Sequence, residues 1–487
     1  MAEEQIINQR KQKLRNLEEA GINPYPYSFD KKHNAAELQK EFSKLKKEEK
    51  TKKTVTIAGR VMIARVLGKI SFFEIQDQTG RIQLYASKET LKDYNKLKKI
   101  DSGDFIGIKG TIFKTRTGEI TINIKEFELL SKSIIPLPSK WHGLKDDEIR
   151  YRQRYLDLIA NPEIKETFVK RAKIIKSIRE FLDERGFMEV EIPTMQPIYG
   201  GANAKPFKTH INAFDMDLFL SISPELHLKR LLVGGFEKVY SLAKSFRNEG
   251  VDRTHNPEFT MMECYWAYAD YTDMEKLTEE LYEYVAKKVL GTTKIEYQGT
   301  KIDLKAPWKK ISMIDALKKY GKIDANKLTD KQLQTELKKN NLTLKPFNRG
   351  LAINELFEEL VEDKLIQPTF IKDHPKETTP LCKIHRKNPE LIERFEPFIN
   401  GWEIGNAYSE LNNPIKQREL LMEQEDLGRG GDEEYHPLDE DFIRAIETGM
   451  PPAGGLGLGI DRLVMLLTNS KSIRDVILFP TMRPENE

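Results

Sequence analysis

Between residues 54 and 130, short runs of β-branched and aromatic residues alternate with polar residues. Turn-forming residues separate several of these runs, at 77–80, 102–104 and 117–118. A period of two predicts strands, and Gly, Asp and Ser clusters predict the turns between them. Five such runs, with one helix expected over 88–97, predict a small closed β-barrel over residues 54–135.

A barrel of this size and strand number is typical of the OB type. OB barrels often hold single-stranded nucleic acid by stacking bases on aromatic side chains beside basic ones. Arg65, Phe72 and Gln83 could supply a charge, a stacking face and a base-edge amide. Phe72 could equally belong to the barrel core, and its sequence position does not separate the two interpretations.

The flanks of the barrel suggest the domain organisation. Apolar residues recur among charges before Gly21, which predicts a helical N-terminal extension over 1–53. Residues 31–53 hold nine Lys and four Glu, a local excess of five positive charges. This run is either a solvated helix face or a contact for a phosphate backbone. A proline-rich stretch predicts a linker over 136–150, followed by a larger α+β domain over 151–487.

In the larger domain the pattern predicts a helix over 163–185 and then an edge strand that contains Pro193. Such an edge could serve as a subunit contact. Residues 300–345 are rich in lysine and lack turn glycines, so we expect a mostly helical insertion there, without assignable chemistry.

Composition narrows the function classes. The chain has 487 residues with 79 Lys and Arg against 76 Asp and Glu, a net charge of +3, so any nucleic-acid site must be local. Two cysteines exclude a disulfide scaffold and a cysteine-rich zinc site. We expect no membrane span and no secretory signal, and therefore a cytoplasmic protein.

The hairpin expected over 237–267 carries the first chemical constellation. Guanidinium groups grip phosphates in a fixed fork, and an aromatic ring can stack on adenine. A structural Arg–Glu pair would explain Arg247 alone. It would not explain the whole set on one loop: Arg247, Glu249, Arg253, His255 and Phe259.

A second hairpin is predicted at Asn400-Gly401, a strong two-residue turn. Its register places Glu396 and Glu403 on one face, about 7–8 Å apart, where two carboxylates can share Mg²⁺ ions with ATP phosphates. The alternative is a pair of solvated surface glutamates. In a regular strand, Asn406, Tyr408 and Glu410 would point to the face opposite to that of Glu403. If all four face one site, a bulge near Gly405 is required.

Two further segments could complete a site. Glycines 455, 457 and 459 alternate in an extended run that leaves room for a flat ligand, before Arg462 opens an apolar helix. A flexible turn is the plainer interpretation. Ser223 and Pro224 begin another helix, in which Glu225 could complement the helix dipole or hold a substrate amine.

Taken in order, the Pro193 strand, FRNEG with RTHNPEF, and GLGLGIDR resemble motifs 1, 2 and 3 of the class II aminoacyl-tRNA synthetases. The barrel in front resembles the subclass that charges lysine, aspartate or asparagine. GGANAKPF, SPELHLKRLLVGGFEKVY and GNAYSELN are similar to its bacterial lysyl branch. The resemblance covers nearly the whole chain. It implies an antiparallel catalytic sheet flanked by helices, and a homodimer with Pro193 at the contact.

The same resemblance implies a role for each candidate residue. Arg247 and Arg462 would be catalytic. ATP would bind the residues of motifs 2 and 3: Arg247, Glu249, Arg253, His255, Asn256, Phe259, Gly459 and Arg462. L-lysine would bind an acidic pocket: Gly201, Glu225, Glu263, Tyr265, Asn406, Tyr408 and Glu410. Two or three Mg²⁺ ions would bind Glu396 and Glu403. The anticodon of tRNA(Lys) would be read by Arg65, Phe72, Gln83 and Glu119.

The charge of the pocket favours lysine, because a substrate with two ammonium groups needs acidic walls. An aspartate pocket would need Arg or Lys at its end. An aspartyl or asparaginyl enzyme, a paralogue that transfers lysine to a protein, and a non-catalytic RNA-binding paralogue are the alternatives. In one departure from the family pattern, Tyr408 stands where members often carry Phe.

Overall fold

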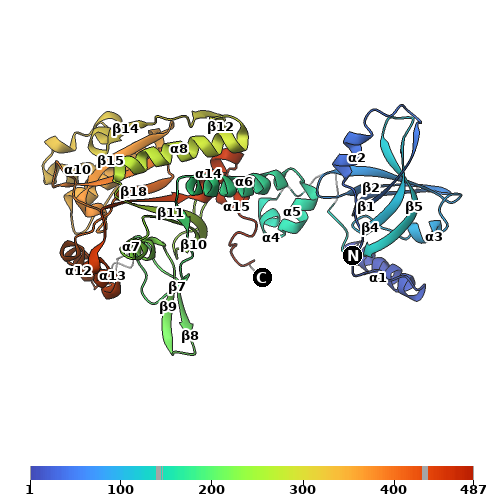
Figure 1. The fold of residues 1–487 in the computed structure, drawn as a ribbon, viewed down its shortest axis with the longest axis horizontal. Coiled ribbons are helices and arrows are strands. Elements are labelled where there is room, and N and C mark those ends of the chain that lie inside the picture. Colours follow the sequence, from blue (N-terminus) through green and yellow to red (C-terminus); the bar gives the residue numbers. More distant parts are fainter. Residues whose placement is uncertain (1, 139–143, 145, 430–436, 486–487) are drawn as a thin grey trace. The chain divides into compact units, whose positions relative to one another are not determined.

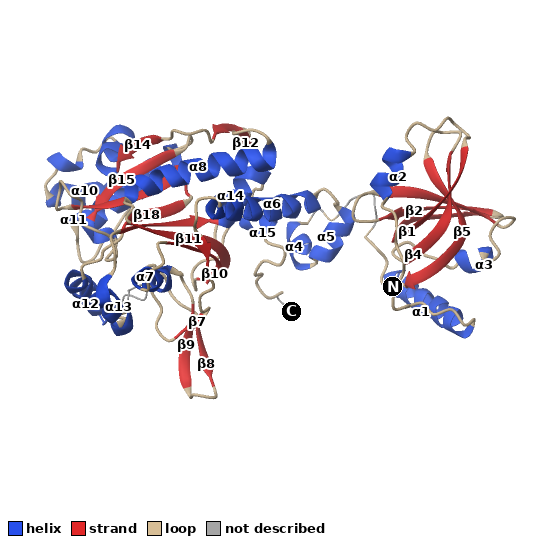
Figure 2. Cartoon of the chain, viewed as in Figure 1, coloured by secondary structure: helices blue, strands red, loops and turns tan. Residues whose placement is uncertain are grey.

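The computed structural model describes residues 2–138, 144, 146–429 and 437–485, which form two compact units, 1–143 and 144–487 (Figures 1 and 2). Each unit has its own hydrophobic core, so each is described by itself. Among the helices that these residues form, none is long and apolar enough to cross a membrane.

The first unit is built on a closed five-stranded barrel, as predicted. Its strands pair in the order β1-β2-β3-β5-β4. Their inward residues alternate with outward ones; Val55, Ile57, Ile75 and Ile108 are fully buried. The helix expected over 88–97 is shorter than predicted. The elements are β1 (Lys50–Leu67), β2 (Ile70–Gln76), β3 (Arg81–Ser87), α3 (Tyr94–Leu97), β4 (Phe105–Lys114) and β5 (Ile120–Ser131).

The N-terminal segment is not helical throughout, contrary to the prediction for 1–53. Helix occupies α1 (Ala2–Glu19) and α2 (Ala35–Glu41), and β1 already begins at Lys50, which pairs with Phe113 of β4. Leu17 and Leu38 are buried in the barrel core. The segment therefore packs into the barrel instead of extending from it.

The predicted linker over 136–150 falls partly on residues 139–143 and 145, outside the described residues. Its last part is helical, because α4 (Asp147–Arg152) begins inside it. Asp146 caps this helix by accepting hydrogen bonds from the backbone N–H groups of Glu148 and Ile149.

The second unit is built on a nine-stranded sheet with the order β14-β15-β16-β18-β19-β11-β10-β6, to which β17 adds beside β16. All inner pairs are antiparallel, but both edge pairs, β14 with β15 and β6 with β10, are parallel, so the sheet is mixed. The strands are β6 (Met188–Glu189), β10 (Lys238–Phe246), β11 (Glu258–Ala267), β14 (Lys309–Ser312), β15 (Thr369–Pro375), β16 (Leu391–Ile399), β17 (Trp402–Glu403), β18 (Gly405–Ser409) and β19 (Ala453–Gly459).

Helices cover both faces of this sheet. On one face, Tyr240 and Met262 pack in the core formed with α6 (Ile164–Asp183), α8 (Tyr271–Leu290) and α14 (Ile460–Thr468). On the other face, Val239 and its cross-strand partner Tyr265 pack in the core formed with α7 (Glu225–Val233) and α13 (Glu440–Gly449). Helix α6 confirms the helix predicted over 163–185.

Two predictions for this unit are corrected. The edge strand with Pro193 is broken into β6 and β7 (Met195–Gln196), and Pro193 lies between them, because proline cannot donate to a ladder. The segment 300–345 is not mostly helical at its start: β13 (Thr300–Asp303) forms a hairpin with β12 (Lys294–Tyr297), and β14 is an edge of the main sheet.

The remaining elements lie around the sheet. Strands β7, β9 (Met216–Leu220) and β8 (Lys208–Ile211) form a small sheet whose β8–β9 hairpin projects from the unit (Figure 1). The other helices are α5 (Arg154–Ala160), α9 (Met313–Ala316), α10 (Asp330–Lys339), α11 (Arg349–Val361), α12 (Pro414–Arg429) and α15 (Ile473–Val476), with short π or 3₁₀ turns η1 (Leu317–Gly321), η2 (Ala325–Lys327), η3 (Glu362–Lys364) and η4 (Lys376–Thr378).

Candidate active site

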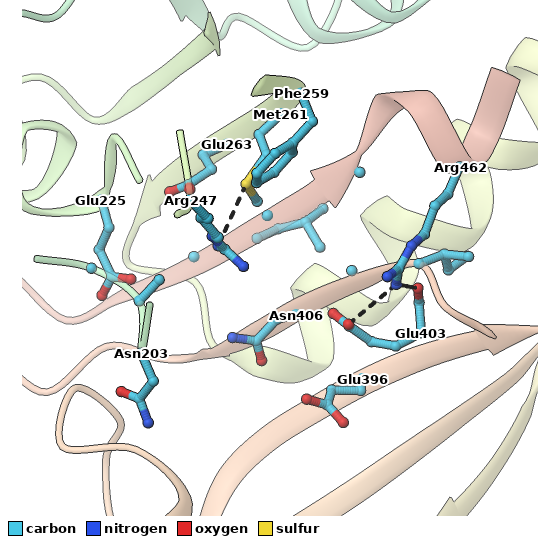
Figure 3. Close-up of a pocket in the computed structure, with 18 of the residues that line it drawn as sticks. Asn203, Glu225, Arg247, Phe259, Met261, Glu263, Glu396, Glu403, Asn406 and Arg462 are labelled. Atoms are coloured by element: carbon cyan, nitrogen blue, oxygen red, sulfur yellow. Dashed lines mark hydrogen bonds and ion pairs between the residues drawn. The ribbon is translucent and has the colours of Figure 1, made fainter. Parts of the chain in front are cut away.

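A cavity of about 370 Å³ opens on the α7 side of the sheet (Figure 3). Its walls come from α7, the β10–β11 hairpin and strands β16 to β19. The predicted residues that line it are Gly201, Glu225, Arg247, Glu249, His255, Asn256, Phe259, Glu263, Tyr265, Glu396, Glu403, Asn406, Tyr408, Glu410, Gly459 and Arg462. Arg253 does not line it; this residue is exposed, and its carbonyl accepts a hydrogen bond from Ile473 N.

The register of the β10–β11 hairpin positions the motif 2 residues. Ser245 lies opposite Phe259, so Arg247 follows the end of β10 and comes beside the face of Phe259 and Met261. The Arg247 guanidinium carbon is 5.2 Å from the centre of the Phe259 ring. Its Nε is buried and has no hydrogen-bond partner among the described residues. A half-buried guanidinium whose Nε donor is unused is suited to an anionic ligand.

Three carboxylates form one end of the cavity: Glu225, Glu263 and Glu410, all at most 4% exposed. Glu263 Oε1 accepts a hydrogen bond from Ser223 Oγ (2.8 Å), and Oε2 accepts one from the Tyr265 hydroxyl (3.2 Å). Burial, helped by the nearby Glu225 carboxylate, raises the pKa of Glu263 to about 8.

Behind this acidic end lies a residue that the sequence reasoning missed. Lys229 Nζ is 2.6 Å from Glu225 Oε1 and 2.5 Å from Glu410 Oε2, and its side chain is fully buried. The Tyr408 hydroxyl donates to both oxygens of Glu225 at 2.6 Å. Burial raises the pKa of Glu410 well above the usual range, although Lys229 opposes that rise.

Glycine backbone closes the walls of this end. A Cβ at Gly455 would lie 1.9 Å from Glu410 Oε1, so the carboxylate lies against bare backbone. Gly201 has φ +89°, and a Cβ there would lie 2.7 Å from Ser223 Oγ. Both positions exclude a side chain.

The opposite end carries Arg462 and its neighbours (Figure 3). Arg462 Nη1 donates to the Glu403 carbonyl and lies 3.4 Å from Glu403 Oε2. Arg462 Nη2 is 3.2 Å from His255 Nε2, while His255 Nδ1 contacts Asp252 Oδ2 at 2.9 Å. Basic groups from motifs 2 and 3 therefore converge on one wall.

Glu396 and Glu403, the predicted Mg²⁺ ligands, both line this end of the cavity. Glu396 Oε1 accepts a hydrogen bond from Arg394 Nη2 at 2.5 Å, and its Oε2 is 4.0 Å from His374 Nε2. Within the described part of the chain, no group of three or more side chains suits a metal ion. Mg²⁺ is commonly held by one or two carboxylates together with substrate phosphates, so the pair fits a nucleotide-borne ion.

The predicted bulge is present. Phe398 lies opposite Glu403, and Phe395 opposite Ala407, so three steps on β16 correspond to four on the facing chain. The extra residue near Gly405 shifts the alternation of side chains by one position, so even-numbered residues after it face the same side as Glu403 before it. Glu403 therefore lines the same cavity as Asn406, whose Oδ1 accepts a hydrogen bond from Arg394 Nε at 2.8 Å.

In the barrel unit, the predicted nucleic-acid residues lie on the outer face. Phe72 is half-buried and absent from the core, which contains Phe73 instead, so the core interpretation of Phe72 is wrong. Phe72 and Tyr85 lie 5.2 Å apart between ring centres, in a row that Phe113 extends. Gln83 Oε1 accepts a hydrogen bond from Thr121, while Arg65 and Glu119 are exposed.

Comparison with known proteins assigns the class. The family model "tRNA synthetases class II (D, K and N)" matches residues 146–483, and a model of an "OB-fold nucleic acid binding domain" matches residues 55–130. The chain belongs to the class II tRNA synthetases of this D, K and N group.

Particular relatives match over almost the full length. The chain is 54% identical to a protein of Clostridium novyi over 98% of its own length and 94% of the relative's. It is 54% identical to a protein of Thermoanaerobacter pseudethanolicus over 99% and 97%, and 52% identical to one of Moorella thermoacetica over 100% and 99%. Each of these relatives is named "Lysine--tRNA ligase".

Proposed function

We propose that the protein ligates L-lysine to tRNA(Lys) at the expense of ATP, through a lysyl-adenylate. One observation carries the choice of lysine: the amino-acid end of the cavity is walled by Glu225, Glu263 and Glu410. An amino acid with two ammonium groups supplies the counter-charges that buried carboxylates need. The lysine--tRNA ligase relatives support the same substrate.

In the first step, an oxygen of the lysine carboxylate attacks the α-phosphorus of ATP, and the bond to pyrophosphate breaks. The nucleophile is already an anion, so the site needs no protein base to activate it. The cavity instead offers cationic groups, and Arg247 has the unused donor for the α-phosphate. Catalysis then rests on positioning and on stabilising the charge of the transition state.

Around the nucleotide, we assign the adenine to the Phe259 face, with Glu249 and Asn256 beside it. The β- and γ-phosphates go to His255 and Arg462, and to Arg253 if its exposed side chain turns inward. Mg²⁺, two or three ions in our proposal, would be held by Glu396 and Glu403. Bound there, Mg²⁺ would neutralise phosphate charge.

In the second step, the terminal 3′-hydroxyl of the tRNA attacks the adenylate carbonyl, and AMP leaves. We assign anticodon reading to the outer face of the barrel, at Arg65, Phe72, Gln83 and Glu119. Aromatic stacking on Phe72 and polar contacts from its neighbours suit unpaired bases.

We further propose a homodimer in the cytoplasm. Exposed apolar side chains around Pro193 support a subunit contact there: Met188 is 52% exposed and Met195 is 56% exposed. Both cysteines are free thiols, as a reducing compartment favours.

The test is amino-acid-dependent exchange of pyrophosphate into ATP by the purified full chain. We expect exchange with L-lysine and none with aspartate or asparagine, followed by transfer of lysine to tRNA. Exchange driven by aspartate or asparagine would assign the protein to another member of the group. Lysine appearing on protein instead of tRNA, or no exchange with any amino acid, would contradict the proposal.

A further inference from the structure

Lys229 is a buried cation that does not line the cavity. It lies on α7 one turn after Glu225, and its Nζ contacts one oxygen of Glu225 and one of Glu410. The Tyr408 ring lies 5.4 Å from the same Nζ. The ammonium group therefore contacts two carboxylates that line the cavity without lining the cavity itself.

This arrangement leaves one oxygen of Glu410 unused. Oε2 forms the 2.5 Å ion pair with Lys229, but neither oxygen of this buried carboxylate has a hydrogen-bond partner in the described part of the chain, and Oε1 is not in that ion pair. Oε1 lies against the bare backbone of Gly455, which lines the cavity. An unsatisfied buried carboxylate oxygen at a cavity wall is positioned to accept a hydrogen bond from a ligand.

The charges explain why a cation is needed. Three buried carboxylates close together cannot all ionise without counter-charges. The two ammonium groups of lysine balance two of them, and Lys229 balances the third. Without Lys229, a bound lysine would leave one carboxylate either protonated or unpaired.

We propose that Lys229 is a positioning residue that fixes Glu225 and Glu410 and sets the pocket's charge to match a diammonium amino acid. The inference rests on the proposed function. It assigns to Lys229 no contact with substrate and no part in the bond-making steps.

A merely structural ion pair would have a different consequence. Losing it would reduce the amount of folded enzyme and lower kcat, but the surviving molecules would bind lysine normally. Losing a positioning residue raises the KM for lysine and leaves the KM for ATP unchanged.

The test compares Lys229→Met and Lys229→Gln, which remove the charge, with Lys229→Arg, which keeps it. The matched control is Lys132→Met: Lys132 is likewise fully buried and bridges Asp101 (2.6 Å) and Asp104 (2.8 Å), but in the barrel unit. The KM values for lysine and ATP and kcat are measured by pyrophosphate exchange, and folding is measured by circular dichroism.

We expect both neutral variants to raise the lysine KM at least tenfold with the ATP KM within twofold, and Lys229→Arg to recover most of the loss. Lys132→Met should leave both KM values unchanged. A lysine KM within twofold of the unmodified chain in a folded neutral variant would overturn the proposal. If neither neutral variant folds, Lys229→Arg decides: a tenfold rise in its lysine KM contradicts the charge argument, and a KM near that of the unmodified chain supports it. Failure of the unmodified chain to use lysine would instead refute the proposed function.

Discussion

Ser223, just before α7, donates a 2.8 Å hydrogen bond from its Oγ to Oε1 of Glu263, which lies in β11. The Tyr265 hydroxyl donates to the other oxygen. Both donors fix the orientation of the carboxylate, so its protonation state is the main variable left.

The first prediction concerns Glu263→Gln. Removing the buried negative charge should weaken lysine binding by about 2–3 kcal/mol, roughly 30–150-fold in affinity. The reason is that hydrogen bonds between charged groups are stronger than those between neutral groups. ATP affinity should change little. Isothermal titration with each ligand checks this, with Ser223→Ala as a milder control. Equal losses for both ligands would contradict the assignment of the pocket.

The second prediction concerns protons. With a pKa of about 8, the free Glu263 carboxyl is mostly protonated at pH 7, whereas an ammonium ligand requires the ionised form. Ionisation of Glu263 should therefore contribute close to one released proton when lysine binds at pH 7, and affinity should rise with pH up to about 8. Calorimetry in buffers of different ionisation enthalpy measures the release. Glu263→Gln should lower the release by about one proton, and an unchanged release in this variant would implicate another group, such as Glu410, whose pKa burial also raises.

The third prediction concerns Glu396→Ala. If Glu396 helps to hold Mg²⁺, its loss should raise the Mg²⁺ concentration needed for half-maximal pyrophosphate exchange by several fold, while the lysine KM stays constant. Titration of exchange against Mg²⁺ is the measurement. Glu390→Ala, at an exposed position on the same approach to β16, is a control. An unchanged Mg²⁺ dependence would remove Glu396 from the metal site.

The fourth prediction concerns the barrel. Phe72→Ala should lower kcat/KM for tRNA charging by an amount equivalent to about 1–3 kcal/mol, which is the range for loss of one stacked base. Formation of lysyl-adenylate should be unchanged. Charging and pyrophosphate exchange are compared on the same preparation. Tyr27→Ala, a fully exposed aromatic residue of the same unit, is the control. Parallel loss of both reactions would point to a folding defect.

The sequence predicted those parts of the fold that periodicity and turn chemistry determine. Buried and less buried residues alternate strictly along β2, and Asn400-Gly401 adopts positive φ at both residues, as its hairpin requires. With this turn, Phe398 pairs with Glu403 in the structure. Residues 300–345 were misjudged because strand β14 pairs with β15, more than 50 residues away, which local composition does not reveal.

Lys229 escaped sequence reasoning for a physical reason. Glu225 and Lys229 are four residues apart, the spacing of an ordinary exposed helix pair. Helix α7 packs against the sheet, and Glu410, which directly follows the distant strand β18, contacts Lys229, so the pair becomes part of a buried triad. Arg394 was missed similarly, because its partners Glu396 and Asn406 meet only in the folded sheet.

The single surplus residue near Gly405 has a wider consequence. It lets one continuous stretch of chain bring Glu403, Asn406, Tyr408 and Glu410 to the same cavity, where we propose that Glu403 serves the nucleotide and the other three serve the amino acid. Deleting Gly405 would remove no functional side chain. It would still turn either Glu403 or the residues that follow it away from the cavity. The register of this one stretch therefore sets the relative positions of the proposed nucleotide and amino-acid sides of the cavity. A shift in register at one side would also shift the other.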